Sequence, residues 1–159
     1  MNKLISKIVG VALGLTLATG VGAGVALGNN NISKADAADS TDILTTGVND
    51  STNKTNTWSN SYLTIVQSRG ETPSGKSQTD PNASYLTAPR WYAYNVITFT
   101  PASNYRIDAV TVIANTASYA TALSGSTWDN ATATASNTIV TIIPTTKTAV
   151  FSVTMGGPC

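Results

Sequence analysis

The stretch from residue 92 to residue 115 limits the fold more than any other part of the chain. It holds two runs rich in β-branched and aromatic residues, 92–100 and 105–115, separated by the Pro-Ala-Ser-Asn segment 101–104. Two such runs around a turn-forming segment predict a β-hairpin. Apolar residues occur on both faces of the first run, which is typical of a strand covered on two sides. We therefore expect this hairpin to be the centre of a β-sandwich.

The rest of the chain after residue 57 also favours extended structure. Segment 69–82 contains glycines, prolines and hydroxyl residues and reads as a long polar loop, and segment 116–123 fits either a helical turn or an extended run. Further strands are expected at 61–67, 84–88, 131–135, 138–143 and 149–155. About eight strands without a long helix predict an all-β fold, an antiparallel β-sandwich of the jelly-roll or immunoglobulin-like type.

The first 37 residues have the organisation of a secretory signal. Lys3 and Lys7 precede a long apolar stretch, and Ala-Asp-Ala at 35–37 is a small-x-small pattern of the kind that signal peptidase cleaves. We expect a signal helix over 1–37, a flexible lead-in over 38–57 and a β-sandwich domain over 58–159. An uncleaved membrane anchor is the alternative, because the apolar stretch is long enough to span a bilayer.

Composition excludes several classes of function. Charged residues make up 11% of the chain, and from residue 38 onward polarity comes from 24 Thr and 14 Ser. Without the leader, six basic and seven acidic residues remain, so no basic field is present to bind nucleic acid. Histidine is absent, which removes the commonest general base and transition-metal ligand. Cys159 is the single cysteine, so an internal disulfide and a thiolate zinc site are excluded.

Aromatic residues near polar loops are the best candidates for a ligand site. Sugar rings stack their C–H faces on Trp and Tyr, and neighbouring Arg and Asp side chains bind the hydroxyl groups. The alternative is that these aromatic residues pack in the core or cap the ends of the sandwich. The candidate glycan-binding residues are Trp58, Trp91, Tyr92, Arg90, Trp128 and Asp129.

Charged and amide residues offer weaker candidates. Arg106 and Asp108 have the spacing of a surface ion pair. The Asp and Asn residues at 80–82 and 129–130 fit either calcium ligation or simple turns, and we expect turns. We expect no catalytic residue, no metal site and no cofactor. Cys159 either forms a disulfide with another chain or marks the point where a longer reading frame was cut.

Segments 88–92, 118–123 and 126–128, together with the expected hairpin, resemble a pattern found in uncharacterised secreted β-sandwich proteins of Gram-positive bacteria of the Firmicutes and Mollicutes type. The resemblance covers roughly residues 60–159. It implies an extracellular β-sandwich and brings no catalytic residues with it. Proteins of this kind typically continue past the Gly-x-Cys region into one more strand, whereas this sequence ends there, so one interpretation is a truncated reading frame.

These observations predict a non-catalytic module that is secreted or held at the cell surface and that binds or adheres to cell-wall or environmental glycans. We expect the protein not to bind nucleic acid and to contact a membrane only during export. One alternative is a small extracellular hydrolase or an accessory domain of one. A second alternative is a structural surface protein that assembles through an open sheet edge.

Overall fold

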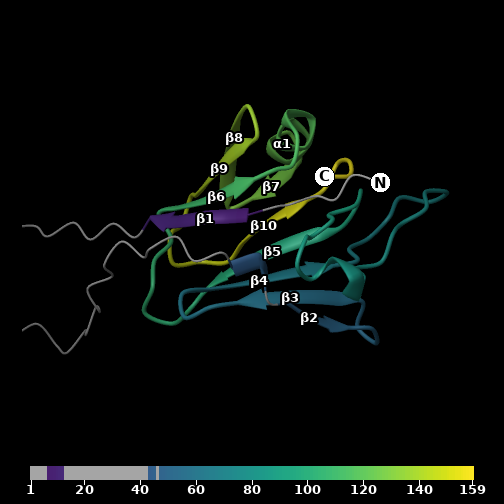
Figure 1. The fold of residues 1–159 in the computed structure, drawn as a ribbon, viewed down its shortest axis with the longest axis horizontal. Helices are drawn as coiled ribbons and strands as arrows, with labels where there is room; N and C mark the ends of the chain where they lie inside the picture. Colours follow the sequence, from purple (N-terminus) through teal and green to yellow (C-terminus); the bar gives the residue numbers. More distant parts are fainter. Residues whose placement is uncertain (1–6, 13–42, 46) are drawn as a thin grey trace, which may run out of the picture.

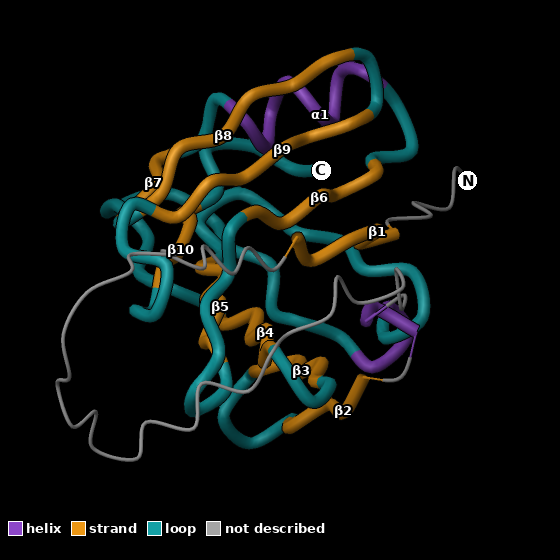
Figure 2. Tube along the Cα trace, turned by 90° about the vertical axis from the view of Figure 1, so that its left-hand side faces the viewer, coloured by secondary structure: helices purple, strands orange, loops and turns teal. Residues whose placement is uncertain are grey.

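The computed structural model describes residues 7–12, 43–45 and 47–159, and its strands form two antiparallel sheets (Figure 1). The four-stranded sheet has the order β1 (Lys7–Ala12), β6 (Ala109–Ile113), β9 (Ile139–Pro144) and β8 (Ala131–Ser136). The six-stranded sheet has the order β2 (Gly47–Asp50), β3 (Thr55–Ser59), β4 (Leu63–Ser68), β5 (Val96–Pro101), β10 (Phe151–Thr154) and β7 (Thr127–Asp129). Figure 2 shows β8, β9, β6 and β1 following one another in this order, with β5, β4, β3 and β2 apart from them. The described chain is therefore mostly β, as the sequence predicted.

One α-helix and two short 3-10 helices complete the described structure. The α-helix α1 (Ala117–Ser124) begins at Thr116, whose side chain accepts a hydrogen bond from the amide of Tyr119. This is N-capping, and it decides between the two readings of segment 116–123 in favour of the helix. Helix α1 lies against β8 and β9 (Figure 1). The 3-10 helices are η1 (Ile43–Thr45), beside β1 and β3, and η2 (Ala83–Tyr85).

A single hydrophobic core draws side chains from both sheets. Period-two alternation places Ile97 and Phe99 of β5 inward, and Val110 and Val112 do the same in β6. The rings of Phe99 and Phe151 stack with their centroids 4.8 Å apart across the β5–β10 pair. Because residues of both sheets belong to the same buried cluster, the two sheets share one core.

The predicted hairpin over 92–115 is wrong. Its two runs become β5 and β6, and these strands lie in different sheets. The connecting segment contains a β-turn, in which the amide of Tyr105 donates to the carbonyl of Ala102 at 3.1 Å, but this turn does not join paired strands. After it, the amide of Ile107 donates to the carbonyl of Lys147 at 2.8 Å, and the Ile107 side chain is fully buried. The chain passes from the six-stranded to the four-stranded sheet between the two runs, and β5 pairs with β4 and β10 instead.

Other local expectations had mixed outcomes. The strands expected at 61–67, 131–135, 138–143 and 149–155 are confirmed as β4, β8, β9 and β10 with shifts of a few residues at their ends. The strand expected at 84–88 is wrong, because this segment contains part of η2. The polar loop over 69–82 contains no helix or strand.

The N-terminal third of the chain is described only in part. Of the expected signal helix over 1–37, residues 1–6 and 13–37 lie outside the described residues, and residues 7–12 form β1 against β6. Of the expected lead-in over 38–57, residues 47–57 supply β2 and the first part of β3, which pair in register within the six-stranded sheet.

Candidate functional site

Three buried amide side chains hold the segment between β4 and β5 against the core face of the six-stranded sheet. Asn56, Gln67 and Asn95 are fully buried, and we call them the amide network. The side-chain nitrogen of Gln67 donates to Asn95 Oδ1 and to the carbonyl of Arg90, both at 2.8 Å. Asn56 Nδ2 donates to the carbonyl of Asn82 at 3.1 Å. The network therefore ties the strands to two points of the loop that covers them.

Asn95 adds two more hydrogen bonds to the same segment. Its Oδ1 accepts from the amide of Tyr92 at 3.0 Å, and its Nδ2 donates to the carbonyl of Thr79 at 3.1 Å. Buried polar groups that all find partners stabilise a single arrangement, because each alternative leaves one of them unpaired. Asn95 therefore fixes the conformation of the segment from residue 79 to residue 95, and Gln67 and Asn56 attach this segment to the sheet.

This segment presents a cluster of two tyrosines and one arginine, which we call the tyrosine–arginine cluster (Tyr85, Arg90 and Tyr92). The guanidinium carbon of Arg90 lies 5.0 Å from the centre of the Tyr85 ring. The rings of Tyr85 and Tyr92 meet edge to face, with centroids 6.4 Å apart and planes at 67°. All three side chains are only partly buried. The cluster thus combines aromatic surface with a cation at a solvent-accessible position.

The environment of Tyr92 fixes its protonation state. Burial is the main cause that raises the pKa of Tyr92 above 10.0, and hydrogen bonding with Tyr85 adds to it, while Arg90 acts in the opposite direction. The phenol therefore stays protonated at neutral pH and can donate a hydrogen bond. Tyr85 itself is positioned by η2, where Asn82 Oδ1 accepts from the amide of Ser84 at 2.8 Å.

Two of the predicted tryptophans are core residues. Trp58 is completely buried, and its Nε1 donates to the carbonyl of Leu86 at 2.7 Å. A Cβ atom added at Gly47 would lie 2.4 Å from Trp58 Nε1, so the backbone is closely packed against this ring. Trp91 is 2% exposed. Neither ring has a face open to a sugar, which corrects the expected platform at these positions in favour of packing.

Trp128 and Asp129 do not form a joint site. Trp128 is half-buried, stacks on Phe99 with centroids 6.3 Å apart, and donates from Nε1 to the carbonyl of Leu123 at 3.2 Å. Asp129 is exposed and follows Trp128 on β7, so the two side chains point to opposite faces of the strand. Of the six predicted site residues, only Arg90 and Tyr92 come together on an accessible surface.

The other polar candidates form hydrogen bonds and ion pairs within the protein. Asn130 Nδ2 donates to the carbonyl of Val150 at 2.9 Å, and its Oδ1 accepts from the amide of Thr146 at 3.2 Å. Asp80 lies 3.3 Å from Arg69 Nε and also faces Lys54 Nζ at 3.7 Å. Asn82 fits the turn interpretation, because its Oδ1 accepts from the amide of Ser84 at 2.8 Å. The contacts of Asn130 and Asp80 are instead made with residues far away in the sequence. The described residues hold no cluster of three or more His, Cys, Asp or Glu side chains placed to bind a metal ion.

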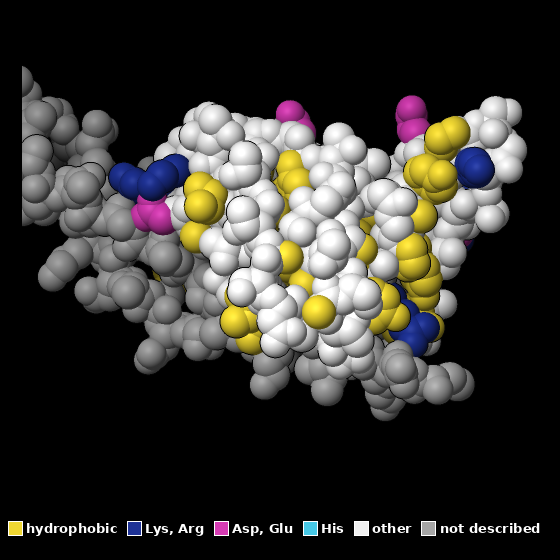
Figure 3. Space-filling view, turned by 90° about the horizontal axis from the view of Figure 1, so that it is seen from above, with side chains coloured by type: hydrophobic (Ala, Val, Ile, Leu, Met, Phe, Trp, Pro, Cys, Tyr) yellow, Lys and Arg dark blue, Asp and Glu magenta, His cyan; other side chains and the backbone are white. Residues whose placement is uncertain are grey.

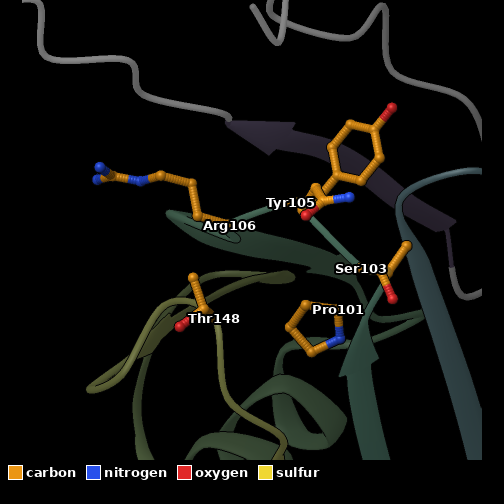
Figure 4. A pocket seen from close by; sticks show the side chains of 7 residues that line it. Pro101, Ser103, Tyr105, Arg106 and Thr148 are labelled. Atoms are coloured by element: carbon orange, nitrogen blue, oxygen red, sulfur yellow. The ribbon is translucent and has the colours of Figure 1, made fainter. Parts of the chain in front are cut away.

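Sequence reasoning missed a pocket of about 440 Å³ beside the β5–β6 connection. Figure 4 shows Pro101, Ser103 and Thr148 around this hollow, with the Tyr105 ring at one side and the Arg106 side chain extending away from it. The expected ion pair is confirmed nearby: Arg106 Nη2 lies 2.7 Å from Asp108 Oδ1, and Lys147 Nζ also contacts that oxygen. The charge of Arg106 is thus directed toward Asp108.

Cys159 follows β10 in the sequence, and its side chain is buried. Its amide and carbonyl exchange hydrogen bonds with those of Trp91 at 2.8 and 3.1 Å. Burial raises the pKa of the thiol to about 12, so almost none of it is thiolate at neutral pH. A disulfide with another chain would require this end of the chain to open.

One face of the molecule carries few groups that could take part in chemistry. The face in Figure 3 is mainly uncharged, with scattered hydrophobic side chains and few Lys, Arg, Asp or Glu. Within the described part of the chain, no helix is both long and apolar enough to cross a membrane. No protein-family model, curated protein or solved structure matches the chain.

Proposed function

We propose that the protein is an extracellular, non-catalytic β-sandwich module that binds glycans through the tyrosine–arginine cluster. The observation that carries this proposal is the contact of Arg90 with Tyr85, and of Tyr85 with Tyr92, on a partly exposed surface. Tyrosine faces suit the C–H faces of sugars, and the guanidinium and the Tyr92 hydroxyl supply hydrogen-bond donors for sugar oxygens. The fixed backbone beneath the cluster lowers the entropy cost of binding.

The sandwich and the export are parts of the same proposal. Two antiparallel sheets with one shared core support a sandwich architecture. The leader pattern at 1–37 and the surface rich in Thr and Ser support secretion through a signal peptide. The ligands would then be glycans of the cell wall or the surroundings.

Affinity electrophoresis against a panel of soluble cell-wall and environmental polysaccharides tests the glycan proposal. We expect Tyr85→Ala and Arg90→Ala to weaken binding by roughly fivefold or more each, because a desolvated aromatic or cation–π contact contributes about 1 kcal/mol. Tyr119→Ala on α1 is the matched control, since it removes a partly buried tyrosine elsewhere. Retention equal to that of the unmodified protein for both cluster variants would refute the assignment.

A further inference from the structure

Strand β6 has a neighbour that belongs to the expected leader. Strand β1 covers the edge of β6 that faces away from β9, and the two strands pair antiparallel. The register places Ile8 opposite Val112 and Val11 opposite Val110. The edge of β6 therefore accepts an antiparallel strand with apolar residues opposite its own core residues.

The backbone direction of β6 follows from one hydrogen bond at its end. The amide of Ala114 donates to the carbonyl of Thr138 at 2.8 Å, on the β9 side. Because successive backbone groups of a strand point to opposite sides, the amides and carbonyls of Ala109, Thr111 and Ile113 point toward β1. These are the groups that lose their partners when β1 is absent.

Nothing in the sequence of β6 protects that edge. Natural sheet edges are blocked by proline, by charged side chains or by covering segments. Residues 109–113 read Ala-Val-Thr-Val-Ile and contain neither proline nor charge. The core residues that the structure describes begin at position 43, so a chain that starts at residue 38 contains all of them.

We propose that the processed chain forms a symmetric homodimer in which β6 pairs antiparallel with β6 of a second copy. The inference rests on the proposed export, because removal of residues 1–37 is what uncovers the edge. A two-fold axis at Thr111 places Val110 opposite the partner's Val112 and Ala109 opposite the partner's Ile113. Val110 and Val112 are both core residues, so valine meets valine on the core face.

The two-fold arrangement also gives the backbone groups of β6 hydrogen-bond partners and keeps like charges apart. Thr111 of each copy meets Thr111 of the other with amides and carbonyls directed across the axis, so the outward groups of β6 all find partners. The same register places Asp108 opposite the partner's Ala114 and Arg106 opposite the partner's Thr116. No like charges are therefore opposed at either end of the paired strands.

Light scattering coupled to size-exclusion chromatography tests this inference on residues 38–159 and on the full chain. We expect the molar mass of the 38–159 form to double as its concentration rises to roughly 100 µM, since weak self-association lies in the micromolar range. The full chain should keep the mass of one copy because β1 occupies the edge. A 38–159 form that stays at one copy throughout, or a full chain that also doubles, overturns the dimer.

Two substitutions at the symmetry axis sharpen the test. Thr111→Pro removes the outward amide while the hydrogen bonds to β9 remain, so we expect the mass to return to that of one copy with a circular dichroism spectrum that stays β-rich. Thr111→Val keeps the amide and should dimerise like the parent. If Thr111→Pro dimerises as well, the interface is not β6. Glycan retention is read separately, so loss of the dimer and loss of the proposed binding are distinguishable.

Discussion

Replacing Asn95 by alanine should destabilise the protein more than any other single change in the amide network. Asn95 is fully buried, and its side chain accepts from Gln67 Nε2 and the Tyr92 amide and donates to the Thr79 carbonyl. The substitution leaves these three groups short of a partner in a buried environment. A buried group without its partner costs about 1–3 kcal/mol, so the free energy of unfolding should fall by about 3 kcal/mol or more.

Urea unfolding followed by circular dichroism measures this loss, and the melting temperature should fall by roughly 10 °C for a chain of this size. Asn53→Ala is the matched control, because Asn53 is exposed and its side chain bonds Asp50 Oδ2 at 2.6 Å on the surface. We expect the control to lose about 1 kcal/mol or less. If Asn95→Ala cost no more than Asn53→Ala, the three groups would be satisfied by water and the argument for a rigid segment 79–95 would fail.

Three further changes probe other parts of the molecule. Phe151→Ala removes the ring stacked on Phe99 and should lower the free energy of unfolding by about 3–5 kcal/mol in a urea titration. Cys159 should react with a thiol reagent far more slowly in the folded than in the urea-unfolded chain. Because burial raises the pKa of the thiol from its ordinary value of 9.0 to about 12 in the folded chain, its contribution to stability is present below pH 9 and is lost between pH 9 and about 12. Urea titrations across this range should show that loss, and Cys159→Ala should lack it. Asp108→Asn leaves two cations without their carboxylate and should cost about 1 kcal/mol, less at high salt.

The sequence predicted strands better than it predicted their partners. Period-two alternation identified β4 and β10 because apolar residues recur at every second position, Leu63 and Ile65 in β4 and Phe151 and Val153 in β10. It could not show that the runs of the expected hairpin enter different sheets, since that depends on Ile107 packing in the core and bonding Lys147 far along the chain.

The sequence predicted two of the three residues of the tyrosine–arginine cluster, Arg90 and Tyr92, but not Tyr85. Arg90 and Tyr92 are close in sequence, so their association required only that the segment be exposed. Tyr85 joins them through η2, and the signal for that helix was the Asn-x-Ser pattern at its start, where Asn82 caps the amide of Ser84. Trp58 was assigned to a loop because its neighbours are polar, although Thr and Asn are also the residues of β3.

The buried amides specify the alignment of β3 with β4, which apolar residues alone do not. A strand that slips by two residues keeps its hydrophobic side chains on the same face, so alternation alone does not distinguish the correct alignment from the slipped one. In the native alignment Asn56 lies opposite Gln67. The next pair on the same face, two residues along, is the apolar pair Trp58 and Ile65. A two-residue slip would force an amide against a hydrocarbon side chain without a hydrogen-bond partner, and misaligned sheets would be eliminated during folding by that cost.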